Sequence, residues 1–175
     1  APADKQAITE LTEQFGCELL PDPGSQTAAI NLGVQSATAQ HRFVNWLGDD
    51  DRLTPGSLAL TASALNSNPE AVVAFGACEY IDSAGKPLWV SRAGQWAPRL
   101  LSWGPDLIPQ PGMLIRRTSW DQVKGVDTSL RFAFDLDLLL NLRRHGTFID
   151  VGDVVSQFRW HADSLTVSDR SASLD

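Results

Sequence analysis

The fold is decided by the stretch Asn45-Trp-Leu-Gly-Asp-Asp-Asp-Arg-Leu53, in which an apolar segment ends in three consecutive carboxylates. Residues 43–47 are typical of a buried strand, and Asp49, Asp50 and Asp51 follow at its carboxyl end. Adjacent like charges repel one another, so the triplet needs solvent, cationic partners or a metal ion. Open α/β sheets bind ligands at the carboxyl ends of their strands, and Mg²⁺ in phosphate chemistry takes one or two protein carboxylates. The stretch therefore predicts a metal site for a phosphorylated substrate.

Helices and strands are expected to alternate on both sides of this stretch. Upstream, the pattern predicts helices at about 4–15 and 27–39 and a short strand at 17–20. Downstream, a helix begins at Thr54-Pro55. The other expected elements are a strand at 71–75, a hairpin at 78–90, an irregular segment at 91–111, a strand at 113–116, a helix at 136–144 and a strand at 147–151. This alternation predicts an α/β domain with a mixed or mostly parallel sheet flanked by helices.

Composition limits the class of protein. The chain has 175 residues, 43% hydrophobic and 20% charged, which is ordinary for a single globular domain. Its net charge of −7 argues against binding to nucleic acid or to anionic membranes. No apolar run approaches the ~20 residues of a membrane span, and two cysteines are too few for a disulfide scaffold. Without an initiator Met or a signal-peptide pattern, we expect a fragment or a processed form, with one domain at 1–165 and a mobile tail at 166–175.

Several segments resemble, in order and spacing, the family 2 glycosyltransferases, which have the GT-A fold. They are Asp22-Pro-Gly-Ser-Gln-Thr, Trp46-Leu-Gly-Asp-Asp-Asp-Arg-Leu-Thr-Pro-Gly56, Tyr80-Ile-Asp-Ser-Ala-Gly85, Gln110-Pro-Gly-Met-Leu-Ile-Arg-Arg117, Phe134-Asp-Leu-Asp137 and Phe158-Arg-Trp-His161. The resemblance extends from about residue 22 to residue 164. The family opens with a strand, a helix and a second strand before the segment at which this sequence starts. The resemblance therefore predicts an N-terminally incomplete domain.

The resemblance implies inverting transfer of a sugar from a nucleotide-diphosphate sugar to a saccharide or other hydroxyl acceptor, assisted by Mg²⁺ or Mn²⁺. A divalent ion would stabilise the charge that grows on the departing diphosphate, and a carboxylate would take the proton of the acceptor hydroxyl. It also implies the cytoplasm, where nucleotide sugars are made, with peripheral membrane association as a variant. A non-catalytic or truncated binding module of the same fold is the alternative. A sugar nucleotidyltransferase is a further rival, but the Gly-rich basic loop expected of that class is not visible.

Metal binding is expected at the acidic triplet. By the resemblance Asp50 is the leading metal ligand, and Asp49 and Asp51 are the other candidates. The first aspartate of the common DxD pattern would fall at Gly48, which departs from the family. His161 is a candidate for a second metal ligand or a phosphate contact. The alternatives are a solvated acidic turn and a structural histidine.

Asp135 resembles the catalytic base of the family. Asp135 and Asp137 also suit the positive end of a helix, where acidic side chains stabilise the helix without any catalysis, and the two roles can coexist. Asp22 and Asn31 resemble donor-binding positions.

Acceptor binding is expected downstream of the hairpin. The segment that begins at Gln110 resembles the acceptor side of the family. Trp96 and Trp103 lie in the irregular segment and are candidates for stacking on an acceptor sugar. Trp46 and Trp120 instead suit the core.

Overall fold

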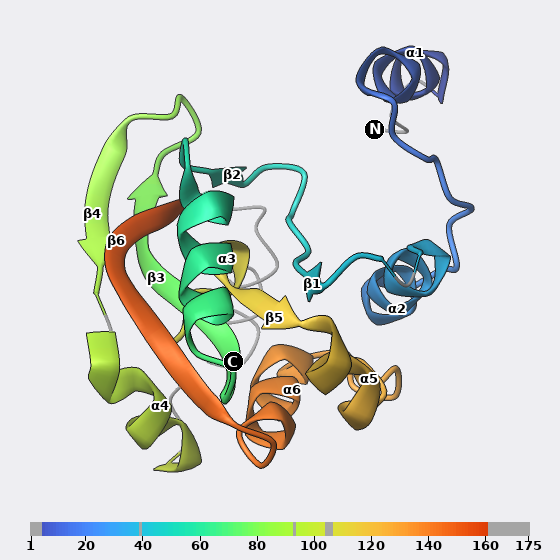
Figure 1. Cartoon of the computed structure of the whole chain (residues 1–175). Coiled ribbons are helices and arrows are strands. Elements are labelled where there is room, and N and C mark those ends of the chain that lie inside the picture. Colours follow the sequence, from blue (N-terminus) through green and yellow to red (C-terminus); the bar gives the residue numbers. More distant parts are fainter. Residues whose placement is uncertain (1–4, 39, 93, 104–106, 161–175) are drawn as a thin grey trace, which may run out of the picture.

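Six strands form one mixed sheet within the part of the chain that the computed structural model describes, which is residues 5–38, 40–92, 94–103 and 107–160 (Figure 1). The strands are β1 (Phe43–Val44), β2 (Arg52–Leu53), β3 (Ala71–Ile81), β4 (Pro87–Ser91), β5 (Leu114–Arg116) and β6 (Thr147–Arg159). Their order is β1-β5-β3-β6-β2, and β4 pairs with the last part of β3. The mixed α/β architecture confirms the expected fold class.

The parallel pair β3–β6 forms the centre of the sheet. Its register runs from Ala71 opposite Thr147 to Ile81 opposite Arg159. The first eight residues of β3 are all buried, as expected for a strand that is covered on both faces. The remaining strand pairs are antiparallel, so the sheet is mixed rather than mostly parallel. β1 ends the strand order, and no strand of the described residues pairs with its outer edge.

Helices cover both faces of this sheet (Figure 1). The helices are α1 (Lys5–Phe15), α2 (Gln26–Ser36), α3 (Ser57–Ser67), α4 (Ala97–Leu100), α5 (Arg117–Val123) and α6 (Phe134–Leu142). On one face Leu65 of α3 packs in a small cluster with Ala74 and Leu114. On the other face a larger cluster joins α2, α4, α5 and α6 to β5 and to β3, whose Phe75 side chain is buried in it. Burial of each large apolar side chain contributes about 1.5–3 kcal/mol, so this larger cluster dominates the stability.

The same cluster supports the residues that lead to the acidic triplet. The Trp46 ring packs against the cluster and meets Trp120 of α5 edge-on, with ring centroids 5.9 Å apart. Phe134 and Leu138 of α6 belong to the cluster as well. The segment before the triplet and the helix that carries Asp135 therefore rest on one core.

Several predicted boundaries are wrong. The expected strands at 71–75 and 78–81 are one strand, β3. At Gly76 this strand runs so close to β6 that a Cβ would lie 2.5 Å from Asp153 O. The last strand continues past 151 to Arg159. No strand forms at 17–20, and strand pairing after Phe43 stops at Val44.

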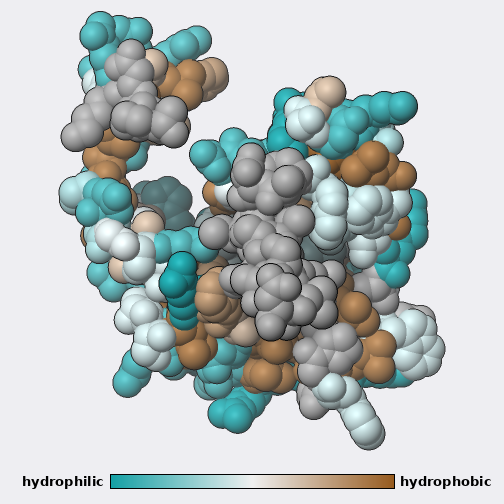
Figure 2. All heavy atoms as spheres, turned by 180° about the vertical axis from the view of Figure 1, so that it is seen from behind, coloured by the Kyte–Doolittle hydropathy of each residue, from teal (hydrophilic) through white to brown (hydrophobic). Residues whose placement is uncertain are grey.

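α1 lies apart from the sheet and is joined to α2 by an extended segment (Figure 1). Leu11, Phe15 and Leu19 on this part of the chain are exposed, and apolar side chains are visible there in the view from behind (Figure 2). The predicted boundary at residue 165 and the tail at 166–175 lie outside the described residues.

Candidate functional site

The acidic loop, residues 48–51, is the last part of the connection between β1 and β2. Asp51 N donates to Gly48 O at 3.2 Å and closes the turn. A Cβ placed on Gly48 would lie 2.9 Å from Asp50 Oδ1 and 3.2 Å from Asp51 Oδ2, so both carboxylates lean over the same side of Gly48. An aspartate at position 48 would crowd these two groups.

Negative charge is concentrated at Asp51. Burial, together with the smaller effects of the Asp50 and Asp49 charges, raises the pKa of the Asp51 carboxyl from 3.8 to about 6. The main-chain N–H of Arg159, which donates to Asp51 Oδ1 at 3.1 Å, and the Arg159 charge act in the opposite direction. A half-buried carboxylate beside two others favours an added cation, because a cation relieves both the repulsion and the desolvation.

Arg159 at the end of β6 also binds the loop through its side chain. Its Nε donates to Asp50 O at 3.1 Å, and its Nη1 donates to Asp82 O at 3.0 Å and to Ser83 O at 2.9 Å. Asp82 and Ser83 belong to the turn between β3 and β4, so one side chain joins the acidic loop to this hairpin. Sequence reasoning assigned no role to Arg159, whose only signal is its place in the segment Phe158-Arg-Trp-His161.

Gln110 lies beside the segment that leads into the acidic loop. It begins the 3-10 turn η3 (Gln110–Gly112), and its Nε2 donates to Trp46 O at 2.7 Å. Asn45 Nδ2 donates to Met113 O at 2.6 Å, also next to this turn. The structure therefore brings Gln110 close to the loop. Its predicted contact with an acceptor stays a prediction.

Asp135 lies in the first turn of α6, where its Oδ1 accepts a hydrogen bond from Leu136 N at 2.9 Å. Ala133, the residue before the helix, has φ of 55°, a left-handed conformation that costs roughly 1–2 kcal/mol for a residue with a Cβ. Asp137 Oδ2 accepts from Asn141 Nδ2 at 3.1 Å. No hydrogen bond joins Asp135 to Asp51 in the structure. The role of Asp135 as base stays a prediction.

The two predicted donor residues make local or structural contacts. Asp22 is exposed, and its Oδ1 accepts from Gly24 N at 2.8 Å within a turn. Asn31 Nδ2 donates to Val126 O at 2.8 Å, while Asn31 Oδ1 accepts from Val126 N at 3.1 Å. The amide of Asn31 thus ties α2 to the segment after α5. Donor binding by either residue stays a prediction.

The predicted acceptor tryptophans are not brought to the acidic loop. Trp96 is 58% exposed and Trp103 is 86% exposed, on the 3-10 turns η1 (Gly94–Trp96) and η2 (Leu101–Trp103). Both turns flank α4, which lies at the other end of the sheet from the connection between β1 and β2 (Figure 1). His161 lies outside the described residues.

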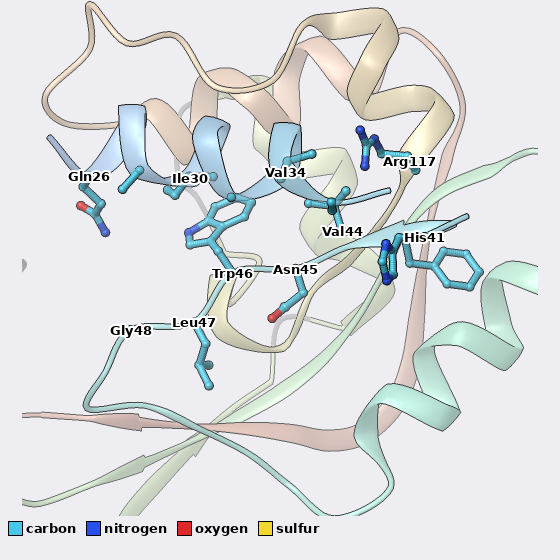
Figure 3. A pocket seen from close by; sticks show the side chains of 14 residues that line it. Gln26, Ile30, Val34, His41, Val44, Asn45, Trp46, Leu47, Gly48 and Arg117 are labelled. Atoms are coloured by element: carbon cyan, nitrogen blue, oxygen red, sulfur yellow. The ribbon is translucent and has the colours of Figure 1, made fainter. Parts of the chain in front are cut away.

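A groove of about 530 Å³ runs between α2 and the chain from His41 to Gly48. Ile30 and Val34 of α2 form one wall, and the Trp46 ring lies below them (Figure 3). Most of the lining is apolar. The groove reaches the acidic loop at Gly48 and continues along the unpaired edge of β1.

The acidic loop suits a hard divalent cation but does not complete its coordination. Across the described stretches, no group of three or more His, Cys, Asp or Glu side chains is arranged to hold a metal. Two carboxylates are nevertheless the donors that Mg²⁺ or Mn²⁺ takes from a protein when phosphate oxygens and water supply the rest. The donor set therefore fits a cation that arrives with a phosphorylated ligand.

The fold is of the GT-A type, and the solved structures of TarS resemble it. Staphylococcus aureus TarS 1–349 has a TM-score of 0.64 at 13% identity, over 91% of this chain and 49% of that one. The complex of TarS 1–349 with UDP has a TM-score of 0.63 at 12% identity, with the same coverage. A longer TarS structure has a TM-score of 0.63 at 14% identity, over 93% of this chain and 30% of that one.

TarS is a GT-A-type glycosyltransferase, and this chain spans about half the length of the TarS 1–349 structures. At this level of identity the likeness shows the fold alone. No protein-family model matches the sequence, and no curated relative matches it either. Among the described residues, every helix is too short or too polar to cross a membrane.

Proposed function

We propose that the domain transfers a sugar from a nucleotide-diphosphate sugar to a hydroxyl acceptor, with inversion and with help from Mg²⁺ or Mn²⁺, as a family 2 glycosyltransferase. The observation that carries the proposal is the pair of carboxylates, Asp50 and Asp51, that converge over Gly48 at one end of a GT-A sheet. The UDP complex of TarS supports a nucleotide donor, because TarS has the same fold. The nucleotide sugar supply also favours the cytoplasm as the compartment.

Each acidic group has its own task in this proposal. Asp50 and Asp51 would hold the divalent ion, with Asp49 adding to the negative potential. When bound, the ion acts as a Lewis acid toward the departing diphosphate. Asp135 accepts the proton of the acceptor hydroxyl, which must be lost as the oxygen attacks the sugar. A single displacement of this kind inverts the anomeric carbon.

The binding step is tested by calorimetry with Mn²⁺ and UDP, followed by other nucleoside diphosphates. We expect binding that requires the metal, is lost in Asp50→Asn or Asp51→Asn, and is kept in the control Asp121→Asn. Asp121 is a suitable control because it is exposed and forms a surface ion pair with Arg117. Binding that is unchanged in both loop variants would contradict the proposed metal site.

The catalytic step is tested by release of the nucleoside diphosphate from a panel of nucleotide sugars in the presence of saccharide acceptors. Asp135→Asn should keep Mn²⁺–UDP binding and lose turnover. Asp137→Asn, in the same turn of α6, should keep both. Equal loss in the two variants would indicate a structural role for this helix end.

The alternative is a binding module of the same fold that has no turnover. One observation favours it: the Asp135 carboxylate accepts a hydrogen bond from Leu136 N within its own helix, a contact that stabilises the helix end without any turnover. Metal-dependent nucleotide binding without release of a nucleoside diphosphate from any donor would support this alternative.

A further inference from the structure

A long hydrogen bond closes the acidic loop. Asp51 N donates to Gly48 O at 3.2 Å, which is at the long end of the normal range. Three adjacent carboxylates oppose this turn by mutual repulsion. Contacts from outside the loop therefore help to hold the Asp50 and Asp51 side chains over Gly48.

Arg159 contacts both the acidic loop and the turn between β3 and β4. Its main-chain N–H binds the Asp51 carboxylate, its Nε binds Asp50 O, and its Nη1 binds Asp82 O and Ser83 O. The hairpin turn that receives Nη1 is itself rigid, because Asp82 Oδ1 accepts from the main-chain N–H groups of residues 84 and 86. The side chain thus connects a repulsive loop to a turn with its own hydrogen bonds.

We propose that Arg159 is a positioning residue, which holds the acidic loop against the hairpin turn so that Asp50 and Asp51 present their carboxylates together to a divalent cation. The inference rests on the proposed function, since it concerns the same metal site. An arginine is required because its planar fork directs Nε and Nη1 toward different carbonyls at fixed angles, whereas a lysine places one ammonium at one point.

The sign of the effect separates positioning from simple electrostatics. If Arg159 acted on the site only through its positive charge, then Arg159→Gln would remove a repulsive charge and strengthen binding of a cation. If Arg159 positions the loop, the same variant weakens binding although the repulsive charge is gone. The two roles therefore predict opposite changes in the dissociation constant for Mn²⁺.

A matched control exists at the opposite end of β3. Arg116 Nε donates to Ala71 O at 2.8 Å, and its Nη2 donates to Leu65 O at 2.8 Å and to Asn68 O at 3.2 Å. This arginine also binds three main-chain carbonyls through Nε and one terminal nitrogen. It contacts none of the residues of the acidic loop, so Arg116→Gln reports the general cost of losing such an arginine.

The experiment titrates Mn²⁺ into the full 175-residue chain and follows free Mn²⁺ by electron paramagnetic resonance, at a temperature where thermal melts show each variant folded. Arg159→Gln should weaken Mn²⁺ binding about tenfold, and Arg159→Lys should recover little of it, which corresponds to the loss of about one charge-assisted hydrogen bond in net terms. Arg116→Gln should keep the dissociation constant within about twofold while lowering the melting temperature. An unchanged or tighter dissociation constant in Arg159→Gln overturns the inference.

A metal-free measurement completes the test. Amide hydrogen exchange without metal should accelerate in residues 48–52 and 82–86 of Arg159→Gln but not of Arg116→Gln. If the wild type binds Mn²⁺ neither alone nor with UDP present, the proposed function fails; if the wild type binds Mn²⁺ in either condition, Asp51→Asn does not, and Arg159→Gln does normally, only the positioning role fails.

Discussion

The two ends of β3 carry the same kind of contact and use it differently. At the amino end, Arg116 binds the carbonyls of Leu65 and Asn68, where α3 ends, and the carbonyl of Ala71, where the strand starts. Leu65 O and Asn68 O also accept main-chain hydrogen bonds, from Asn68 N and Ala71 N, so the arginine adds charged donors to carbonyls at the end of the helix and the start of the strand. At the carboxyl end, Arg159 binds a loop whose own side chains repel one another. The arginine at the amino end of β3 therefore contributes to stability, and the arginine at the carboxyl end supports a loop that suits a cation.

The largest effect on stability is expected at the amino end. Arg116→Met should lower the free energy of unfolding by about 3 kcal/mol, because it removes three charge-assisted hydrogen bonds to part-buried main-chain carbonyls. Urea denaturation of the purified chain measures this. The neighbouring Arg117→Met is the control: it removes a surface ion pair with Asp121 and should cost below about 1 kcal/mol. Equal losses in the two variants would contradict the assigned role of Arg116.

Gly146, also at the amino end of β3, should show the next largest effect on stability. A Cβ on Gly146 would lie 2.3 Å from Glu70 O and 2.6 Å from Val72 Cγ1. Because main chain cannot yield as a side chain does, Gly146→Ala should cost roughly 2 kcal/mol through overpacking. Thermal and urea unfolding check the value, and a cost below about 0.5 kcal/mol would show that the turn before β6 relaxes freely.

At the carboxyl end the stability should depend on pH. Folding raises the pKa of Asp51 from 3.8 to about 6, so the folded protein keeps a proton at pH values where the unfolded chain has lost it. The contribution of Asp51 to stability therefore falls as pH rises from about 4 to about 6. In metal-free buffer at pH 7, Asp51→Asn should be more stable than the wild type, by an amount on the order of 1 kcal/mol after solvent screening.

This prediction is checked by urea denaturation at pH 5 and pH 7 with a chelator present. Asp50, Asp49 and Arg159 are the charged groups that act on Asp51, and all three are kept in the variant. The difference between the wild type and Asp51→Asn should shrink at pH 5. A wild type that is more stable than the variant at pH 7 without metal would show that the charges around Asp51 favour its ionised form.

The smallest effect on stability is expected at Gly48. In Gly48→Ala the new Cβ would meet Asp50 Oδ1 at 2.9 Å, and a carboxylate can rotate away at little cost. We expect a change below about 0.5 kcal/mol in the free energy of unfolding. Mn²⁺ binding should nevertheless weaken, because the two carboxylates no longer converge over residue 48. An unaltered Mn²⁺ affinity would indicate that their convergence is not needed.

The sequence was sufficient for features that depend on local pattern. The Asp82 turn lies where the local pattern placed it, between two paired strands. The helix expected to begin at Thr54-Pro55 begins instead at Ser57, with Gly56 as its N-cap, because Thr54 Oγ1 donates to Val154 O rather than to the helix. The apolar run of β3 was expected as two strands, with Gly76 between them. The structure instead uses it where β6 passes too close for any side chain.

Contacts between distant segments could not be predicted from the sequence. Asn31 and Val126 are 95 residues apart, and Asp51 and Arg159 are 108 residues apart. No periodicity links such pairs, because polar side chains and main-chain groups pair without the regular apolar spacing that reveals a helix or a strand. The hydrogen bond from the Gln110 amide to Trp46 O, 64 residues away, is another contact of this kind.

The long separation between the loop and its arginine bears on synthesis at the ribosome. β3 is complete at Ile81, but its parallel partner β6 arrives with Thr147–Arg159. At translation rates of about 5–20 residues per second, several seconds pass in which β3, the most buried strand of the sheet, has no β6 to pair with. The nascent chain is then most exposed to aggregation, and the acidic loop gains its support only when nearly all of the domain has emerged.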